Sequence, residues 1–175
     1  MRNKVKRIWN TITTIMVSLI VILAVLLWGC RLLGMEVFVV QSGSMEPAYH
    51  VGSLVYVKPV DVSKLQVGDV ITFEMGGGVR GTHRIVEVRN DQDDLMFITK
   101  GDANEVTDNM PVLPEAIVGE VKFTIPYLGF LAVYMQQPPG TYVTISVVAA
   151  ILLLTILPDI IFPEKKTARK REGTR

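Results

Sequence analysis

Three side chains that could carry out hydrolysis together lie in separate polar stretches: Ser44, His83 and Asp108. Serine hydrolysis needs a hydroxyl nucleophile, an imidazole that takes up its proton, and a carboxylate that fixes the imidazole tautomer. Histidine suits the second part because its ordinary pKa of ~6.5 leaves it largely neutral near pH 7. The sequence also offers Ser42, His50 and Asp102 as alternatives, so each part has two candidates.

Each candidate also has an ordinary structural interpretation. The serines lie in a Ser/Gly loop where hydroxyls often cap backbone groups, and a single His on a strand is as often structural as catalytic. His83 begins an amphipathic stretch, which is a rigid base for a catalytic group, whereas His50 lies in a polar segment where we expect solvent exposure. Asp102 directly follows Gly101, so we expect it to bond its own turn, whereas Asp108 is freer to reach another strand.

A metal centre is not expected. A protein zinc site uses about three or four ligands, and neither His has a second His or a Cys near it in the sequence. We therefore expect no metal and no cofactor. Cys30 is the only cysteine, so no intrachain disulfide can form.

The elements that must position these side chains are predicted to be short strands separated by turns. The apolar run at 36–40 predicts the strand that leads into Ser42 and Ser44. Alternation of apolar and polar residues, bounded by Gly, Pro and Asn, predicts five more strands, at 51–57, 67–74, 79–89, 95–99 and 117–124. With no convincing helix between them, we expect a mainly β structure, a small all-β domain.

Two apolar segments flank this domain. Residues 8–30 contain no charge, and as a helix this run of 23 residues would be ~34 Å long, enough to cross a bilayer. Residues 141–162 form a second apolar segment, interrupted only by Pro158 and Asp159. We predict that both are transmembrane helices.

The charge pattern predicts an orientation. Lys and Arg flank both segments, at 1–7 and at 163–175, and basic flanks stay in the cytoplasm. Residues 36–137 hold 7 Lys and Arg against 14 Asp and Glu, a net charge of −7, which is not the footprint of a nucleic-acid-binding protein. We expect a cytoplasmic basic N-terminus (1–7), an extracytoplasmic β-rich domain (31–137) and a cytoplasmic basic tail (163–175).

Four stretches together resemble type I signal peptidases of the ER type, which occur in the eukaryotic ER, in archaea and in some Gram-positive bacteria. The stretches follow one another in the order of the family's boxes: 42–47, 82–85, 101–108 and 126–129. The resemblance implies a small signal-peptidase/LexA-like catalytic domain between membrane helices. The first box is also similar to one in self-cleaving repressors of the LexA type.

The resemblance assigns roles to the candidates. It implies that Ser44 is the nucleophile and that His83 is the base, at the position where ordinary bacterial enzymes have Lys. It implies that Ser42 helps the Ser44 backbone N–H to bind the oxyanion. We assign Asp108 to the triad and Asp102 to local support.

The implied substrates are the signal peptides of exported preproteins, cut after an Ala-x-Ala pattern close to the bilayer. Shallow apolar pockets would receive the small side chains, and we expect them to be formed by Val37, Phe38, Val39, Val40 and Met45. The expected location is a bacterial or archaeal cell membrane, with the ER membrane as the alternative. Partner subunits are left open.

Two other functions compete with this one. The chain could be a membrane-tethered β domain for binding or scaffolding, in which Ser44, His83 and Asp108 are incidental. A LexA-like self-cleaving regulator would need a helix-turn-helix and a cytoplasmic domain, and the sequence predicts neither. We therefore favour a membrane-bound serine endopeptidase that removes signal peptides.

Overall fold

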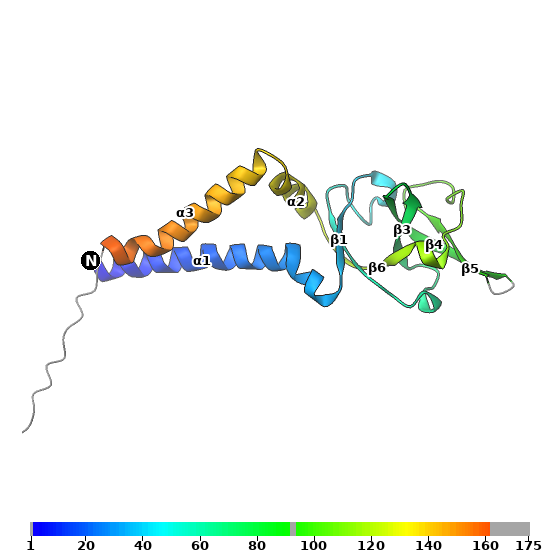
Figure 1. The fold of residues 1–175 in the computed structure, drawn as a ribbon, viewed down its shortest axis with the longest axis horizontal. Helices are drawn as coiled ribbons and strands as arrows, with labels where there is room; N and C mark the ends of the chain where they lie inside the picture. The colour runs from blue at the N-terminus through cyan, green and yellow to red at the C-terminus, as the bar shows by residue number, and fades with distance from the viewer. Residues whose placement is uncertain (1, 92–93, 162–175) are drawn as a thin grey trace, which may run out of the picture.

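The structure is a computed structural model, and it describes residues 2–91 and 94–161. A β domain lies at one end of two long helices (Figure 1). The strands are β1 (Glu36–Val39), β2 (Leu54–Lys58), β3 (Val70–Gly76), β4 (Val79–Asp91), β5 (Asp94–Lys100) and β6 (Ile117–Ile125). The helices are α1 (Arg2–Trp28), α2 (Leu128–Gln136) and α3 (Gly140–Ile161). Short 3₁₀ turns are η1 (Gly29–Leu33), η2 (Gly43–Met45), η3 (Val62–Lys64) and η4 (Pro114–Ala116).

All six strands belong to one antiparallel sheet with the order β1-β2-β6-β3-β4-β5. The expectation of a mainly β structure is thereby confirmed. The β3–β4 hairpin turns at Gly76, Gly77 and Gly78, whose φ angles of 94°, 62° and 78° favour glycine. In this hairpin Ile71 lies opposite His83 and Thr72 opposite Thr82, which sets the face on which each side chain lies.

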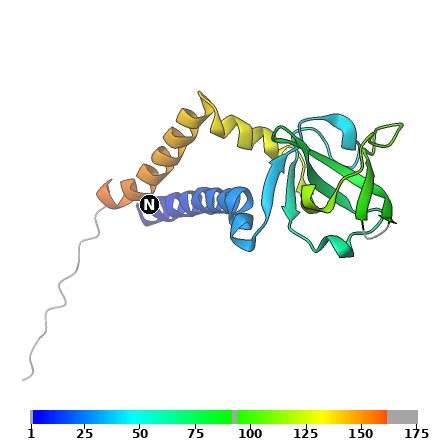
Figure 2. The ribbon, with the colours of Figure 1, turned by 45° about the vertical axis from the view of Figure 1, so that its right-hand side comes forward.

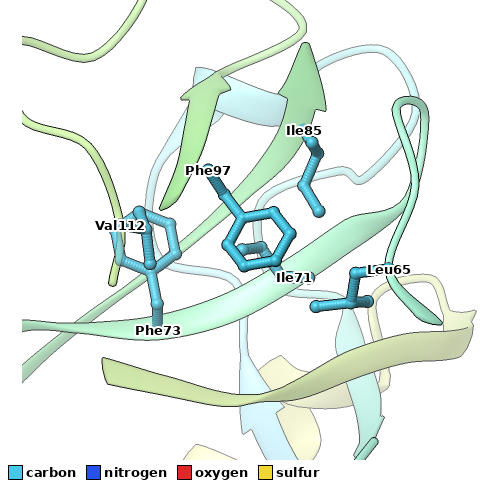
Figure 3. Close-up of a cluster of buried hydrophobic side chains, with 6 residues drawn as sticks. All are labelled: Leu65, Ile71, Phe73, Ile85, Phe97 and Val112. Atoms are coloured by element: carbon cyan, nitrogen blue, oxygen red, sulfur yellow. The ribbon is translucent and has the colours of Figure 1, made fainter. Parts of the chain in front are cut away.

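The main core of the β domain lies between β3, β4, β5 and the segment before β6. Figure 3 shows its six buried side chains, which gather in one cluster between the segments that carry them. They are Leu65, Ile71, Phe73, Ile85, Phe97 and Val112. Because Ile71 and Ile85 flank the position of His83 in the hairpin, burial of this core fixes the backbone that carries the imidazole.

Another cluster joins the sheet to the helices. Leu54 and Tyr56 of β2 pack with Leu27 of α1 and Ala132 of α2. The Tyr56 hydroxyl also donates a hydrogen bond to the carbonyl of Leu26. The β domain therefore has a direct attachment to α1, close to the beginning of β1.

Helix α2 corrects the expectation that residues 31–137 contain no helix. Its segment is apolar on all sides, so it lacks the amphipathic period that would have indicated a helix. It packs on the turn before β2, where the Gly129 N–H donates to the Gly52 carbonyl at 2.8 Å. Gly52 has φ = 80°, and a Cβ there would lie 2.1 Å from the Phe130 ring, so this contact requires glycine.

The two long helices coincide with the apolar segments predicted from the sequence. They lie close together at the ends far from the sheet and diverge toward it, as both views show (Figures 1 and 2). At the close end the Trp9 indole donates to the Leu154 carbonyl at 2.9 Å. By length and composition both helices could cross a membrane. The predicted basic tail, 163–175, lies outside the described residues.

Candidate active site

Ser44, His83 and Asp108 form a hydrogen-bonded series. Nε2 of His83 lies 3.1 Å from Oγ of Ser44, and Nδ1 lies 2.6 Å from Oδ2 of Asp108. A carboxylate only accepts hydrogen bonds, so Nδ1 carries a proton toward Asp108. Nε2 is then left as the acceptor for the Ser44 hydroxyl, which is the tautomer that a general base requires.

The backbone of Ser44 is held in place by the loop after β5. It lies in η2, the single turn that follows β1, and its carbonyl accepts a 2.9 Å hydrogen bond from the Ala103 N–H. A Cβ on Gly101 would lie 2.5 Å from the same carbonyl. Glycine at 101 therefore allows the loop after β5 to approach the serine closely.

His83 lies on β4, with its side chain 14% exposed. On one side its ring meets the Phe73 ring in an edge-to-face arrangement, with centroids 6.2 Å apart. Asp108 approaches from the loop after β5. It is fixed to that strand because its N–H donates to the Thr99 carbonyl at 2.8 Å.

Thr99 is a buried partner of Asp108 that the sequence did not reveal. Its hydroxyl donates to Oδ2 of Asp108 at 2.6 Å, and its side chain is fully buried. Two donors thus converge on one carboxylate oxygen, which limits rotation of the carboxyl group. Thr99 occupies the core face of the predicted strand at 95–99, and the position of Asp108 nine residues later gave no sign of the contact.

Asp102 is engaged differently from what the sequence suggested. Its carboxylate binds the Arg84 guanidinium through two hydrogen bonds, from Nε at 2.8 Å and from Nη2 at 2.7 Å. Arg84 also donates from Nη1 to the Gly68 carbonyl at 2.8 Å. The hydrogen bond to Asp102 raises the pKa of Arg84 above its ordinary value. Asp102 therefore links the loop after β5 to β4 and to the turn before β3, in place of the expected bond to its own turn.

The remaining two candidates lie on either side of the nucleophile turn. Oγ of Ser42 lies 3.4 Å from Oγ of Ser44, close enough to act on the same reacting group. His50 is separate from this site. Its Nδ1 lies 2.6 Å from Glu46 Oε2, and its ring stacks on Tyr127, so it is partnered instead of simply solvated.

A cleft of about 560 Å³ opens beside Ser44 and His83. It lies between β1 with the nucleophile turn on one side and the β3–β4 hairpin on the other. Four of the five expected pocket residues line it: Phe38, Val39, Val40 and Met45. Val37 packs instead in the cluster of α1, α2 and β2, because alternation along β1 directs it away from Phe38. Val39 lies on the same side as Val37 and packs in that cluster, and it also lines the cleft.

No group of three or more His, Cys, Asp or Glu in residues 2–91 and 94–161 is arranged to hold a metal ion. The groups that the site presents are a hydroxyl, an imidazole and a carboxylate. A hydroxyl hydrogen-bonded to an imidazole that is in turn bonded to a carboxylate is the arrangement of a serine hydrolase.

Comparisons with known proteins identify a family model and relatives that this chain matches. A family model described as signal peptidase, peptidase S26, matches residues 12–94. Signal peptidase I W of Bacillus subtilis is 42% identical over 120 residues, a match that covers 64% of this chain and 63% of that protein. The human signal peptidase complex catalytic subunit SEC11C is 32% identical over 152 residues, 78% of this chain and 79% of that subunit. A Dictyostelium discoideum catalytic subunit, sec11, is 31% identical over 151 residues, 79% of this chain and 84% of that subunit.

The chain belongs to the signal peptidase family. The resemblance drawn from the four sequence stretches is thereby confirmed, and so is the expectation that the protein is a hydrolase of the peptidase class.

Proposed function

We propose that the protein is a membrane-bound endopeptidase that removes signal peptides from exported preproteins, with Ser44 as nucleophile. The observation that carries this proposal is the hydrogen-bonded series Ser44, His83, Asp108 at the side of an open cleft. Membership in the signal peptidase family supplies the substrate class.

The proposed reaction follows from the geometry. Oγ of Ser44 attacks the scissile carbonyl while its proton passes to Nε2 of His83, which then donates that proton to the leaving amine. Water, deprotonated by the same imidazole, hydrolyses the resulting ester and returns Ser44 to its starting state. Asp108 stabilises the imidazolium in both halves, and Thr99 keeps Asp108 in place.

The negative charge that develops on the carbonyl oxygen needs donors. The Ser44 N–H and the Ser42 hydroxyl are the groups that we assign to this task. Ser42 is exposed, and its Oγ is 3.4 Å from the nucleophile, so a rotation of its side chain brings the hydroxyl toward the oxygen that forms there. Such preorganised donors act on charge that exists mainly in the transition state.

Substrate residues before the scissile bond would lie in the cleft in extended form. Strand β1 is an edge of the sheet, so its backbone can pair with an added strand. Val40 and Met45 then form apolar walls next to Ser44, and Phe38 forms one further along. These walls suit the small side chains that signal peptidases accept.

A membrane location is supported by the exposure of the long helices. Only 6% of the residues in the apolar window of α1 and 11% of those in α3 are buried, unlike the core helix of a soluble protein. Such exposure of apolar side chains favours an apolar surrounding for both helices, which a bilayer would supply. The basic flanks predict cytoplasmic ends and an extracytoplasmic β domain, in the cell membrane, with the ER membrane as the alternative.

Cleavage of a preprotein by the purified full-length protein, in detergent or reconstituted vesicles, tests the proposal. Wild type should release the mature chain and Ser44→Ala should not. Ser63→Ala is the matched control, because Ser63 is a serine of η3 that does not line the cleft. A wild type without cleavage would favour the competing function, a β domain for binding or scaffolding.

A further inference from the structure

A second groove lies next to the cleft and has a volume of about 510 Å³. The two share Met75, whose side chain is 54% exposed at the end of β3. The loop between β5 and β6 forms its other wall. Its lining includes Phe73, Glu74, Asp108, Met110, Leu113 and Glu115.

The second groove begins at the triad itself. Asp108, the partner of His83, is part of its wall. The ring of Phe73, part of its lining, makes an edge-to-face contact with the His83 ring. The groove therefore lies on the His83 side of the nucleophile, whereas β1 and Met45 lie on the other side.

The position of the second groove matches the path that the substrate chain must take beyond the scissile bond. The residue before the scissile bond stays on Ser44 as an ester, so its side chain remains by the walls of the cleft. The leaving amine must receive its proton from Nε2 of His83, so the chain beyond the bond passes over the imidazole. Past His83 it meets Asp108, Phe73 and Met75, which are the entrance of the second groove.

We propose that the second groove binds the first residues of the mature chain, those that follow the scissile bond. This inference rests on the proposed function and adds a specificity site to it. The groove takes an extended segment, and its apolar contacts come from Met75, Met110 and Leu113. Met110 is 75% exposed without substrate, so a bound segment can bury it.

The charges that line the second groove make it discriminate between acidic and neutral segments. Three acidic side chains line it: Glu74, Asp108 and Glu115. Among the described residues, no basic side chain lines it. Arg80 lies 3.5 Å from Glu74 and offsets part of that charge, so Glu115 and Asp108 dominate the field. Acidic residues early in the mature chain are therefore disfavoured by like-charge repulsion.

Three peptide substrates test the site with the full-length protein in detergent. All share the same sequence through the first residue after the scissile bond. One ends there, one continues with three neutral, partly apolar residues, and one continues with three Asp residues. We expect the neutral peptide to have a kcat/KM about five- to tenfold above the short one, from burial of apolar surface. The Asp peptide should be about fivefold below the neutral one.

Two variants of exposed residues probe the groove itself. Met110→Ser should lower kcat/KM for the neutral peptide toward the value of the short peptide. Glu115→Gln should raise kcat/KM for the Asp peptide relative to that for the neutral peptide. Val106→Ser and Glu105→Gln are matched controls, because both residues are exposed on the same loop and neither lines the groove.

The outcomes separate the two proposals. Equal kcat/KM for all three peptides, cut in a Ser44-dependent way, would overturn the second groove and leave the peptidase function standing. An effect of Val106→Ser as large as that of Met110→Ser would also overturn it. If wild type and Ser44→Ala were equally inactive on every peptide, the proposed function and the groove would fall together.

Discussion

The Thr99 hydroxyl donates to the same Asp108 oxygen, Oδ2, that accepts the hydrogen bond from His83, and both distances are 2.6 Å. The carboxylate is thereby fixed from the core side as well as from the imidazole side. Thr99 is fully buried, so water cannot take over its role. In the proposed mechanism Thr99 is a positioning residue, because it acts only through Asp108.

Thr99→Val should lower turnover while preserving the fold. Valine has nearly the same shape but no hydroxyl, so Asp108 loses one donor, worth about 1 to 2 kcal/mol. We expect kcat to fall about three- to thirtyfold with KM unchanged. Thr124→Val is the control, since it removes a hydroxyl bond to the Leu54 carbonyl, remote from the triad. Equal loss of kcat in both variants would mean that Thr99 has no special connection to the site.

The two aspartates should respond differently to conversion to asparagine. Asp108→Asn should keep its melting temperature within a few degrees and lose several orders of magnitude in kcat, because the imidazole then favours the wrong tautomer. Asp102→Asn should lower stability by about 1 to 2 kcal/mol, since it weakens a charge-assisted pair with Arg84 that is partly exposed. Melting curves and cleavage rates of both variants decide this, and a stable, inactive Asp102→Asn with an active Asp108→Asn would reverse our assignment.

His83 and His50 can be separated in the same way. His83→Ala should be inactive, because Ser44 loses the acceptor of its proton. His50→Ala should cut a preprotein within about threefold of wild type, since a partly exposed ion pair such as His50–Glu46 is worth little. Initial cleavage rates at matched protein concentration give the comparison. An active His83→Ala enzyme would require a different base, such as Lys100 or Lys122.

The sequence predicted the strands and the candidate triad because both depend on local patterns. An apolar run located the first strand and alternation located the other five, and the end of the first strand indicated where Ser44 leaves the sheet. Alternation also held information that the prediction did not use. Along β1 it separates Val37, which packs toward the helices, from Phe38, which faces the cleft.

Other features required the register of strands distant in sequence. Arg84 pairs across the ladder with Lys100, which brings Asp102 within reach just past the end of β5. A bulge between Ile85 and Glu87 shifts that ladder, and no local pattern fixes such a shift. The Thr99–Asp108 bond depends on the path of the loop in the same way. Helix α2 was missed because its apolar residues cover its whole surface.

The orientation of the chain in the membrane can be tested with reporters. We expect a fusion after Arg175 to be cytoplasmic and an insertion at Gly77, in the exposed β3–β4 turn, to be extracytoplasmic. Alkaline phosphatase activity in a bacterial host should therefore appear only for the Gly77 insertion. A fluorescent protein that folds only in the cytoplasm should show the opposite pattern. Phosphatase activity at Arg175 would contradict the orientation.

Ser42 and Ser44 should differ in the depth of their defects. Ser44→Ala removes the nucleophile and with it the covalent route, so no ester intermediate can form. Ser42→Ala leaves the nucleophile, its base and the Ser44 N–H in place, and removes one hydroxyl that lies 3.4 Å from the nucleophile. Loss of one oxyanion donor costs about 10² to 10³ in kcat, so Ser42→Ala should retain slow but measurable turnover with little change in KM.

Ser42→Thr refines the test, because it keeps the hydroxyl. It should recover most of the activity that Ser42→Ala loses, provided that the added methyl group is tolerated at this exposed position. A hydroxyl that only supported the turn would show its loss in the melting temperature, with kcat reduced no more than the fraction of folded protein. Single-turnover rates beside melting curves distinguish these cases. An inactive Ser42→Ala beside an active Ser44→Ala would exchange the roles of the two serines.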